Sequence, residues 1–331
     1  MKPRAVPSFS PSGTGEPFAS VVISVHNDRE HLRDCLCSLR KQHYRNFEVI
    51  VVDAGSTDGT GDMVKDEHPE VRLIITKKVG IGEATNKALL AAKGDYIVFD
   101  LNSDDIVSPT WLRNLVEFME NNTSVGVLGG KRYAYGTDTI DSAGGSINFL
   151  TGDGPPIGHG KRDCGDYSTA REVDYVPVIM TRRDVLHTVG LLDEGYSLYF
   201  EEPDFCLRAK RCGYKVMYTP NAVHWHRGAS VIGGSSLKQY YYLRRNQLRF
   251  VIKNFAMHYL MISLFWLLVV RVFLDALSTT SWFVSLMRTV RPSSMWPEFD
   301  KRVPSVQLHA IAWNVFHFKE IVRMRGRGAD H

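Results

Sequence analysis

Residues 96–105 read YIVFDLNSDD, a short apolar run that ends in a cluster of acids. Apolar runs of this length are typical of a buried strand. Carboxylates held at the end of such a strand can bind a divalent cation, and a bound cation can in turn bind a diphosphate. We therefore interpret the stretch as a strand with a cation site at its carboxyl end, where Asp104 is the ligand and Asn102 lies beside it.

Four further apolar runs flank this stretch, and helix-like segments with short connections separate them. Continuous β-branched runs are typical of strands that are buried on both faces of a parallel sheet. The alternation of strand and helix predicts an α/β fold with a doubly wound, mostly parallel sheet. The five runs are SVVISV (20–25), FEVIVV (47–52), VRLIIT (71–76), YIVF (96–99) and VGVL (125–128).

Helix signals lie between these runs. They consist of apolar residues at helical spacing, a cap before the first turn, or a glycine after the last turn. The first expected helix is capped by Asn27 or Asp28 and has Leu32, Leu36 and Leu39 on its apolar face. The second covers Glu83–Lys93 and is closed by Gly94. The third is capped by Ser108, has Pro109 as its first helical residue and runs to about Asn121.

The second half of the chain is less regular. Residues 131–172 are rich in Gly, Asp and Thr and show little periodicity, which is typical of a functional loop or lid. Strands are expected over Val173–Thr181 and Tyr214–Tyr218, with an acidic stretch and a helix closed by Gly213 between them. Residues 1–17 are rich in Pro, Ser and Gly and lack the apolar core of a signal peptide, so residues 1–18 are expected to be a disordered leader.

The C-terminal region, residues 237–331, is apolar and basic. Ala256–Val270 is strongly apolar and ends at Arg271, which is shorter than the ~20 residues needed to cross a bilayer. A second apolar stretch covers Ser281–Met287. Short apolar helices with nearby Trp266, Trp282 and Arg predict a helical appendage that lies on a membrane surface.

Composition narrows the classes of partner and compartment. The 331 residues carry a net charge of +4, and the basic excess is partly terminal, at Arg323, Arg325 and Arg327. No single basic face is evident, so we expect no nucleic-acid binding; a basic tail beside apolar helices fits an anionic membrane surface better. The five cysteines form no CxxC pair, which favours reduced thiols over a zinc site or a disulfide frame.

Asp104 alone is weak evidence, because an acid after a strand is often a helix cap or part of a solvated turn. Asp53 also follows a strand, and ligands in doubly wound sheets bind beyond the carboxyl ends of the strands. Four motifs occur in order: VVISVHN (21–27), VVDAGSTDGT (51–60), KGDYIVFDLNSDD (93–105) and YFEEPDFCLR (199–208). Together they resemble the family 2 inverting glycosyltransferases of the GT-A fold, and most closely the rhamnosyl- and galactofuranosyltransferases of cell-surface polysaccharide assembly.

This resemblance, which covers about residues 20–255, implies roles for the first half of the chain. Asp53 would contact the nucleotide base, and the triplet Asn102-Ser103-Asp104 would bind the metal. Asn102 departs from the stricter Asp-x-Asp form, so Asp104 is expected to carry the cation. Gly80 and Gly82 precede a helix whose N-terminal amides favour a diphosphate. The residues expected at the nucleotide are Val25, Asn27, Asp53, Gly82, Asn86, Asn102 and Ser103.

In the second half, the acidic motif would provide the acceptor site. Glu202 maps to the general base, where many relatives have Asp, and Glu201, Asp204 and Arg245 are expected to contact the acceptor. The alternative for the three acids is a charged first turn suited to the helix dipole. Arg244, Arg245 and Asn246 resemble an Arg-Asn element of some members, and a solvated helix face is an equal alternative.

The late metal-ligating histidine of the family maps to His226. Alternation along an extended segment puts His224 on the same side, so His224 is a rival, and a packed histidine is the third alternative. The roles of His224 and of Asp105 stay open.

The expected protein is therefore a GT-A glycosyltransferase domain over 19–236, with a nucleotide half (19–130) and an acceptor half (131–236), followed by the membrane-associating region 237–331. It would use Mg²⁺ or Mn²⁺, a UDP-, dTDP- or GDP-linked sugar donor, and a glycan or polyprenyl-linked acceptor. Its expected place is the cytoplasmic face of the cell membrane, as a peripheral or monotopic protein.

Two other functions are compatible with parts of this pattern. A nucleotide-sugar-binding or scaffold protein would keep the fold without turnover, and the Asn102 and Glu202 departures motivate it. A nucleotidyltransferase shares the strand–acid arrangement, but it needs a basic, Gly-rich signature near the first strand. VVISVHNDRE has no such glycines, so this function ranks last.

Overall fold

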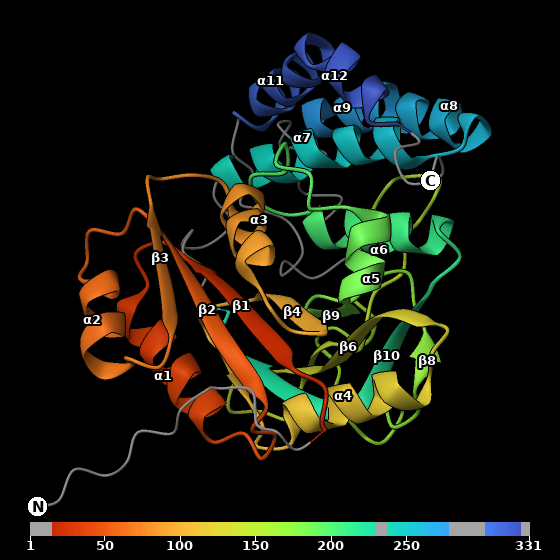
Figure 1. Cartoon of the computed structure of the whole chain (residues 1–331). Coiled ribbons are helices and arrows are strands. Elements are labelled where there is room, and N and C mark those ends of the chain that lie inside the picture. Colours follow the sequence, from red (N-terminus) through yellow and green to blue (C-terminus); the bar gives the residue numbers. More distant parts are fainter. Residues whose placement is uncertain (1–14, 229–236, 278–301, 326–331) are drawn as a thin grey trace, which may run out of the picture.

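The computed structural model describes residues 15–228, 237–277 and 302–325 (Figure 1). Most of the expected leader, the apolar stretch Ser281–Met287 with Trp282, and Arg327 lie outside the described residues. Within the described part, one sheet forms the centre of the molecule, helices cover both of its faces, and the C-terminal helices form a further layer beyond α3 and α6.

Among the described residues the sheet has ten strands, and its main path runs in the order β3-β2-β1-β4-β9-β6-β10-β5. The first four strands of this path are parallel, which confirms the expected βαβ arrangement of the nucleotide half. The strands are β1 (Ala19–Val25), β2 (Phe47–Ala54), β3 (Arg72–Thr76), β4 (Tyr96–Leu101), β5 (Asp105–Val107), β6 (Val125–Ala134), β7 (Ile140–Ser142), β8 (Arg171–Glu172), β9 (Ile179–Arg182) and β10 (Lys215–His226).

The second half of the sheet mixes directions. β9 is inserted antiparallel between β4 and β6, β10 runs parallel to β6, and β5 is antiparallel to β10. β7 and β8 pair with the outer parts of β6 and β10, so the segment 131–172 is less irregular than expected. The strand expected over Val173–Thr181 is only β9, whereas β10 continues eight residues past the expected end at Tyr218, because it pairs with β6 on one side and β5 on the other.

Helices pack on both faces because successive strand residues are apolar on both sides. Val21 and Ile23 of β1 belong to one buried cluster, and Val22 between them belongs to the other. This alternation of two cores is what a doubly wound sheet requires. The helices of this part are α1 (Arg29–Arg40), α2 (Thr60–Glu67) and α4 (Trp111–Asn121) on one face, and α3 (Ile81–Ala91), α5 (Arg183–Val189) and α6 (Glu201–Arg211) on the other.

Two helix boundaries differ from the expectation. α3 ends at Ala91 with an extended cap, so Gly94 does not close it. Gly94 is required for a close approach instead, because a Cβ there would lie 2.4 Å from the backbone nitrogen of Ser20. α4 begins at Trp111 rather than at Pro109, since the carbonyl of Ser108 accepts the N–H of Trp111 (3.0 Å) in a turn before the helix.

The C-terminal helices extend further than expected. The apolar stretch Ala256–Val270 does not end the helical structure, which continues through Arg271 to Leu277. Residues Met257–Leu274 have a mean hydropathy of 1.9 and are long and apolar enough to cross a membrane by length and composition. The C-terminal elements are α7 (Leu237–Asn254), α8 (Met257–Phe265), the π-helical turn η1 (Trp266–Val270), α9 (Arg271–Leu277), α11 (Val303–Phe316) and α12 (Phe318–Arg323).

Candidate active site

The pairing of β5 with β10 brings Asp104 and His226 together. Asp105 lies opposite His226 in the antiparallel register, and the N–H of Arg227 donates to the carbonyl of Asp104 (3.3 Å). As a result His226 Nε2 lies 3.5 Å from Asp104 Oδ1, although 122 positions separate the two residues (226 minus 104). The expected proximity of Asp104 and His226 is therefore observed.

Asp141 and Arg132 complete this part of the site, and the sequence reasoning missed both. His226 Nδ1 lies 3.3 Å from Asp141 Oδ2, and Arg132 Nε lies 2.5 Å from the same oxygen. Burial lowers the pKa of His226, but the hydrogen bond to Asp141 and the nearby acids outweigh it, so the net pKa is raised. No motif marks Asp141 or Arg132 in the sequence, because they lie on β7 and on the outer end of β6, in the stretch interpreted as irregular.

The structure separates the roles of His224 and Asp105. His224 is fully buried, its ring packs 6.3 Å from the ring of Trp111, and burial holds its pKa well below the ordinary value. It is therefore a packed, neutral histidine. Asp105 is also fully buried; its Oδ2 accepts the N–H of Asn102 (2.9 Å), and burial raises its pKa to about 6. Asp105 thus supports the turn that presents Asp104.

The residues expected at the nucleotide base gather at the carboxyl ends of β1 and β2. Val25 and Asp53 are partners in the β1–β2 register. Asp53 is buried and accepts the N–H of Ser56 (2.8 Å), which fixes the start of the Gly-rich loop. Asn27 has a left-handed backbone (φ 53°), and its Oδ1 accepts the N–H of Thr57 (2.7 Å), which ties β1 to the same loop.

The triplet that precedes Asp105 also contacts this edge. Ser103 Oγ donates to Asp28 Oδ2 (2.5 Å), which links the acid cluster after β4 to the start of α1. Asn102 is exposed, and its backbone N–H is bound by Asp105. Asn102, Ser103 and Asp104 therefore lie between the β1 end and the β10 end of one sheet edge.

Asn86 and Gly82 on α3 contact the chain rather than an open surface. The side chain of Asn86 donates to the carbonyl of Leu192 (3.0 Å) and accepts the Leu192 N–H (2.9 Å). A Cβ at Gly82 would lie 3.3 Å from the carbonyl oxygens of Asp193 and Tyr196. The structure therefore places Asn86 as a support of the loop 192–196, because its amide is already used there, instead of beside a nucleotide.

Glu202 lies in the first turn of α6, next to the end of β4. The rings of Phe99 in β4 and Phe205 in α6 pack edge to face, 5.1 Å apart, which brings the helix onto the strand. Burial raises the pKa of Glu202, and the nearby Arg132 partly offsets this. Glu201 is 5% exposed, and burial together with Glu202 raises its pKa well above the ordinary value.

Asp100 is a third acid in this group, and no sequence signal identified it. It lies in a β-bulge of β4 against β1 and has a left-handed backbone (φ 59°). Both of its carboxylate oxygens are buried and have no hydrogen-bond partner among the described residues. Burial, with a contribution from Glu202, raises its pKa well above the ordinary value. Asp100 therefore faces the first turn of α6 as a buried acid.

Asp204 and Arg245 do not face an acceptor surface, which corrects the roles expected for them. Asp204 is fully buried, and its carboxylate accepts from Arg208 (2.9 Å), Lys253 (2.9 Å) and Asn254 (2.7 Å). Arg245 is 5% exposed and donates to the carbonyl of Gly195 (2.9 Å). Both side chains are used inside the protein, where they join α6, α7 and the loop before α6.

Comparisons with known proteins agree with this geometry. Residues 20–171 match the sequence profile of glycosyl transferase family 2. The Bacillus subtilis protein TuaG, whose assigned role is a glycosyltransferase of teichuronic acid biosynthesis, is 30% identical over 193 residues, which cover 56% of this chain and 75% of TuaG. The chain belongs to glycosyl transferase family 2.

Other members of the family are matched over shorter parts. GlyG of Streptococcus pneumoniae is 35% identical over 115 residues, and EpsH of B. subtilis is 31% identical over 113 residues. These matches cover 33% of this chain, 38% of GlyG and 32% of EpsH, so the chain matches only about a third of the length of these two relatives.

Solved structures show the GT-A fold of the family. One is a mannosyltransferase from Pyrobaculum calidifontis in complex with GDP-Man and Mn²⁺, with a TM-score of 0.56 at 17% identity. The match covers 93% of this chain and 89% of the mannosyltransferase chain. Another is GalNAc-T7 with UDP, GalNAc and Mn²⁺, with a TM-score of 0.59 at 15% identity. The match covers 91% of this chain and 58% of the GalNAc-T7 chain. At these identities the likeness shows the fold alone.

The donor atoms at the sheet edge fit part of a cation site. Over residues 15–228, 237–277 and 302–325, no group of three or more His, Cys, Asp or Glu side chains is arranged to hold a metal ion. Asp104 and His226 offer one carboxylate and one imidazole. Mg²⁺ in phosphate-binding sites is commonly held by one or two carboxylates together with substrate phosphates and water. Asp104 and His226 could therefore be the two protein ligands of a cation whose remaining ligands come from the substrate phosphates and water.

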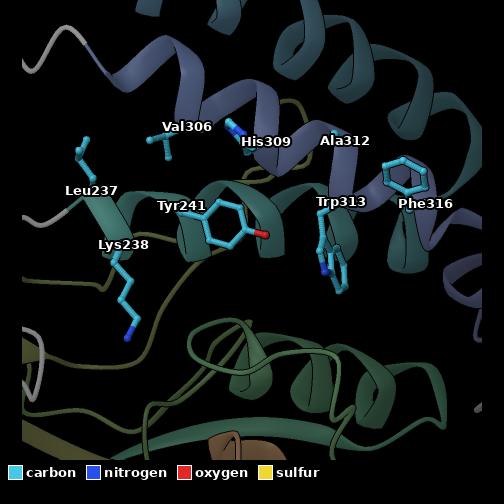
Figure 2. A pocket seen from close by; sticks show the side chains of 8 residues that line it. All are labelled: Leu237, Lys238, Tyr241, Val306, His309, Ala312, Trp313 and Phe316. Carbon is cyan, nitrogen blue, oxygen red and sulfur yellow. The ribbon is translucent and has the colours of Figure 1, made fainter.

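A separate cavity of about 570 Å³ lies between α7 and α11 (Figure 2). It is mostly apolar, with Lys238 and His309 among its lining residues, and Leu237 and Phe316 lie at its opposite ends. It belongs to the C-terminal helices and not to the acidic edge. Its lining residues are Leu237, Lys238, Tyr241, Val306, His309, Ala312, Trp313 and Phe316.

Proposed function

We propose that the protein transfers a sugar from a nucleotide-diphosphate sugar to an acceptor hydroxyl, with inversion at the anomeric carbon. One observation carries this proposal: the Asp104–His226 pair and Glu202, in the first turn of α6, both lie near Arg132. Arg132 forms an ion pair with Asp141 and also acts electrostatically on both Glu202 and His226. The Asp104–His226 pair, which would serve the diphosphate, and Glu202, which would accept a proton, thus lie in the same region of the protein.

The donor would lie across the carboxyl ends of β1, β2 and β4. Asp53 and the Asn27 loop would bind the nucleoside, and Asp104 with His226 would hold a divalent cation. When bound, Mg²⁺ or Mn²⁺ would neutralise the diphosphate as it leaves. The Pyrobaculum structure contains GDP-Man and Mn²⁺, and the GalNAc-T7 structure contains UDP and Mn²⁺, which supports a UDP- or GDP-linked donor and a divalent cation. A dTDP-linked donor stays a prediction.

Glu202 would act as the general base. Its carboxylate would take the proton of the acceptor hydroxyl while the oxygen attacks the anomeric carbon from the face opposite the diphosphate. One displacement at that carbon inverts its configuration. A raised pKa suits this role, because a base with a pKa nearer the working pH accepts the proton more readily. Glu201 lies beside Glu202 and would face the acceptor.

The acceptor is proposed to be a glycan or a polyprenyl-linked glycan of cell-surface polysaccharide synthesis, and the assigned role of TuaG supports this class. The narrower likeness to rhamnosyl- and galactofuranosyltransferases stays a prediction. Apolar side chains on α8, η1 and α9 are exposed, among them Met261 (62%), Phe265 (61%) and Phe273 (62%). Their exposure supports attachment to a membrane, which we propose to be the cytoplasmic face of the cell membrane. The apolar cavity in Figure 2 lies in the same helical layer.

The test is sugar transfer from a panel of nucleotide sugars, with Mn²⁺ or Mg²⁺, by the wild type and by Glu202→Gln. A general base contributes about 10²–10⁴-fold in rate, so the variant is expected to lose activity by that factor. Glu117→Gln, an exposed position on α4, is the matched control and should keep full activity. Glu202→Gln activity close to wild type would remove Glu202 from this role. Nucleotide binding without transfer would favour the scaffold function.

A further inference from the structure

Arg245 and Asn246 of the Arg-Asn element on α7 are buried, which excludes a solvated helix face as the explanation of these two residues. Asn246 has no exposed surface. Its Nδ2 donates to the carbonyl of Leu198 (2.5 Å) and to the carbonyl of Tyr199 (2.9 Å). One amide group thus binds two successive carbonyls of the segment that leads into α6, the helix that carries Glu202.

The segment that Asn246 binds has an unfavourable backbone. Tyr199 (φ 67°) and Phe200 (φ 74°) are consecutive left-handed residues without being glycine, and Phe200 is the residue before the first turn of α6. Left-handed backbone in bulky residues persists only where the surroundings hold it, and such residues cluster at functional sites. The direction of the first turn of α6, and hence of Glu201 and Glu202, depends on this pair.

The amide of Asn246 is itself held in one orientation. Its Oδ1 accepts from Arg245 Nε (2.8 Å), so the two N–H groups point to the carbonyls of residues 198 and 199. Arg245 also donates to the carbonyl of Gly195 (2.9 Å) and lies over the ring of Trp313 at 4.5 Å. Asn314 on α11 donates to the backbone carbonyl of Arg245 (2.9 Å). α7 and α11 thus form a rigid support for the turn.

We propose that Asn246 is a positioning residue for the general base: its two N–H groups hold the left-handed turn Tyr199–Phe200, and the turn sets where the carboxylate of Glu202 lies. This inference rests on the proposed function of Glu202. Asn246 binds the chain on the side of α6 and not the Asp53–Asp104 edge. Its loss should therefore slow the transfer step and leave donor binding unchanged.

The substitution that tests this is Asn246→Asp, which keeps the shape of the side chain. It replaces the NH₂ group with an oxygen, so that an acceptor faces two carbonyl oxygens and the turn loses both hydrogen bonds. Gln247→Glu is a matched control. Gln247 is equally buried on the next position of α7, and its Nε2 donates to the carbonyl of Thr151 (2.9 Å) and to Asp153 (2.8 Å), away from the turn.

We expect Asn246→Asp to lower kcat by about 10²-fold, the loss that an ångström of misplacement can cause, with the donor KM within about twofold of wild type. The milder Asn246→Ala, which removes the bonds without repulsion, should lower kcat in the same direction by a smaller factor. Gln247→Glu should leave kcat unchanged. Equal losses in Asn246→Asp and Gln247→Glu, or a loss only in donor KM, would overturn the proposal.

Hydrogen exchange separates this inference from the transferase function itself. The backbone amides of residues 199–202 should exchange faster in Asn246→Ala than in wild type, and at an unchanged rate in Gln247→Ala. If the wild type transfers no sugar but this exchange pattern is observed, the proposed function fails and the support of the turn stands. If the wild type is active and the amide exchange of residues 199–202 is unchanged in Asn246→Ala, the positioning role fails on its own.

Discussion

The buried ammonium of Lys253 offers the sharpest test of how α7 is fixed to the catalytic domain. Its Nζ lies 2.9 Å from Asp193 and 2.9 Å from Asp204, and the side chain is 5% exposed. Lys253→Met keeps the length of the side chain and removes the charge. Removing one partner of a buried ion pair costs about 3–5 kcal/mol. We expect the lower end, about 3 kcal/mol, because Asp193 keeps Arg249 and Asp204 keeps Arg208.

The assay is urea unfolding of the full chain followed by circular dichroism, with the free energy of unfolding extrapolated to water. Lys210→Met is the matched control. Lys210 also lies 2.8 Å from a carboxylate, that of Asp174, but its side chain is 23% exposed, so its loss should cost less than about 1 kcal/mol. If the two variants lose the same free energy, the buried network does not fix α7 as the structure indicates.

Three further predictions concern the site, the sheet and the C-terminal helices. Burial raises the pKa of Glu202, and a general base must be deprotonated to act. As the pH is lowered, kcat should therefore begin to fall before the pH reaches 4.5, the ordinary pKa of glutamate. A kcat that stays constant down to pH 4.5 would contradict this. Gly94→Ala should cost about 1–3 kcal/mol by thermal unfolding, because the new Cβ would meet backbone atoms of Ser20 and Tyr96 at 2.4 and 2.5 Å, and an unchanged melting temperature would refute it. Phe265→Glu should reduce flotation with anionic vesicles, whereas Leu90→Glu, at an exposed position on α3, should not; equal flotation of both would remove the membrane role of α8.

The strands of the first half could be predicted because each reads as a short apolar run; β1, β2 and β4 are buried on both faces, whereas β3, at the edge of the sheet, is only partly buried. The same runs end at Asp53 and Asp104, so the sheet edge followed from the pattern alone. The proximity of His226 did not. It depends on β5 pairing antiparallel with the far end of β10, and only the family resemblance indicated it.

Other parts of the site have no local signal. Asp141 and Arg132 lie in a segment without periodicity, and their roles come from strand pairing across β6 and β7. Asp100 is buried because a bulge in β4 turns it inward, and a bulge cannot be read from an apolar run. The aromatic and basic residues of α7 resemble a solvated helix, but Asn246 and Arg245 are covered by α11 and the loop before α6, which are distant in sequence.

Metal-dependent nucleotide binding tests the central claim most directly. Isothermal titration of the full chain with UDP, dTDP or GDP should show binding of at least one of them in Mn²⁺ that is lost in EDTA. Asp104→Ala should abolish the Mn²⁺-dependent part, and Asp62→Ala, an exposed acid on α2, should leave it intact. Binding that is equal in Asp104→Ala and wild type, or absent for all three nucleotides, would contradict a donor site at this sheet edge.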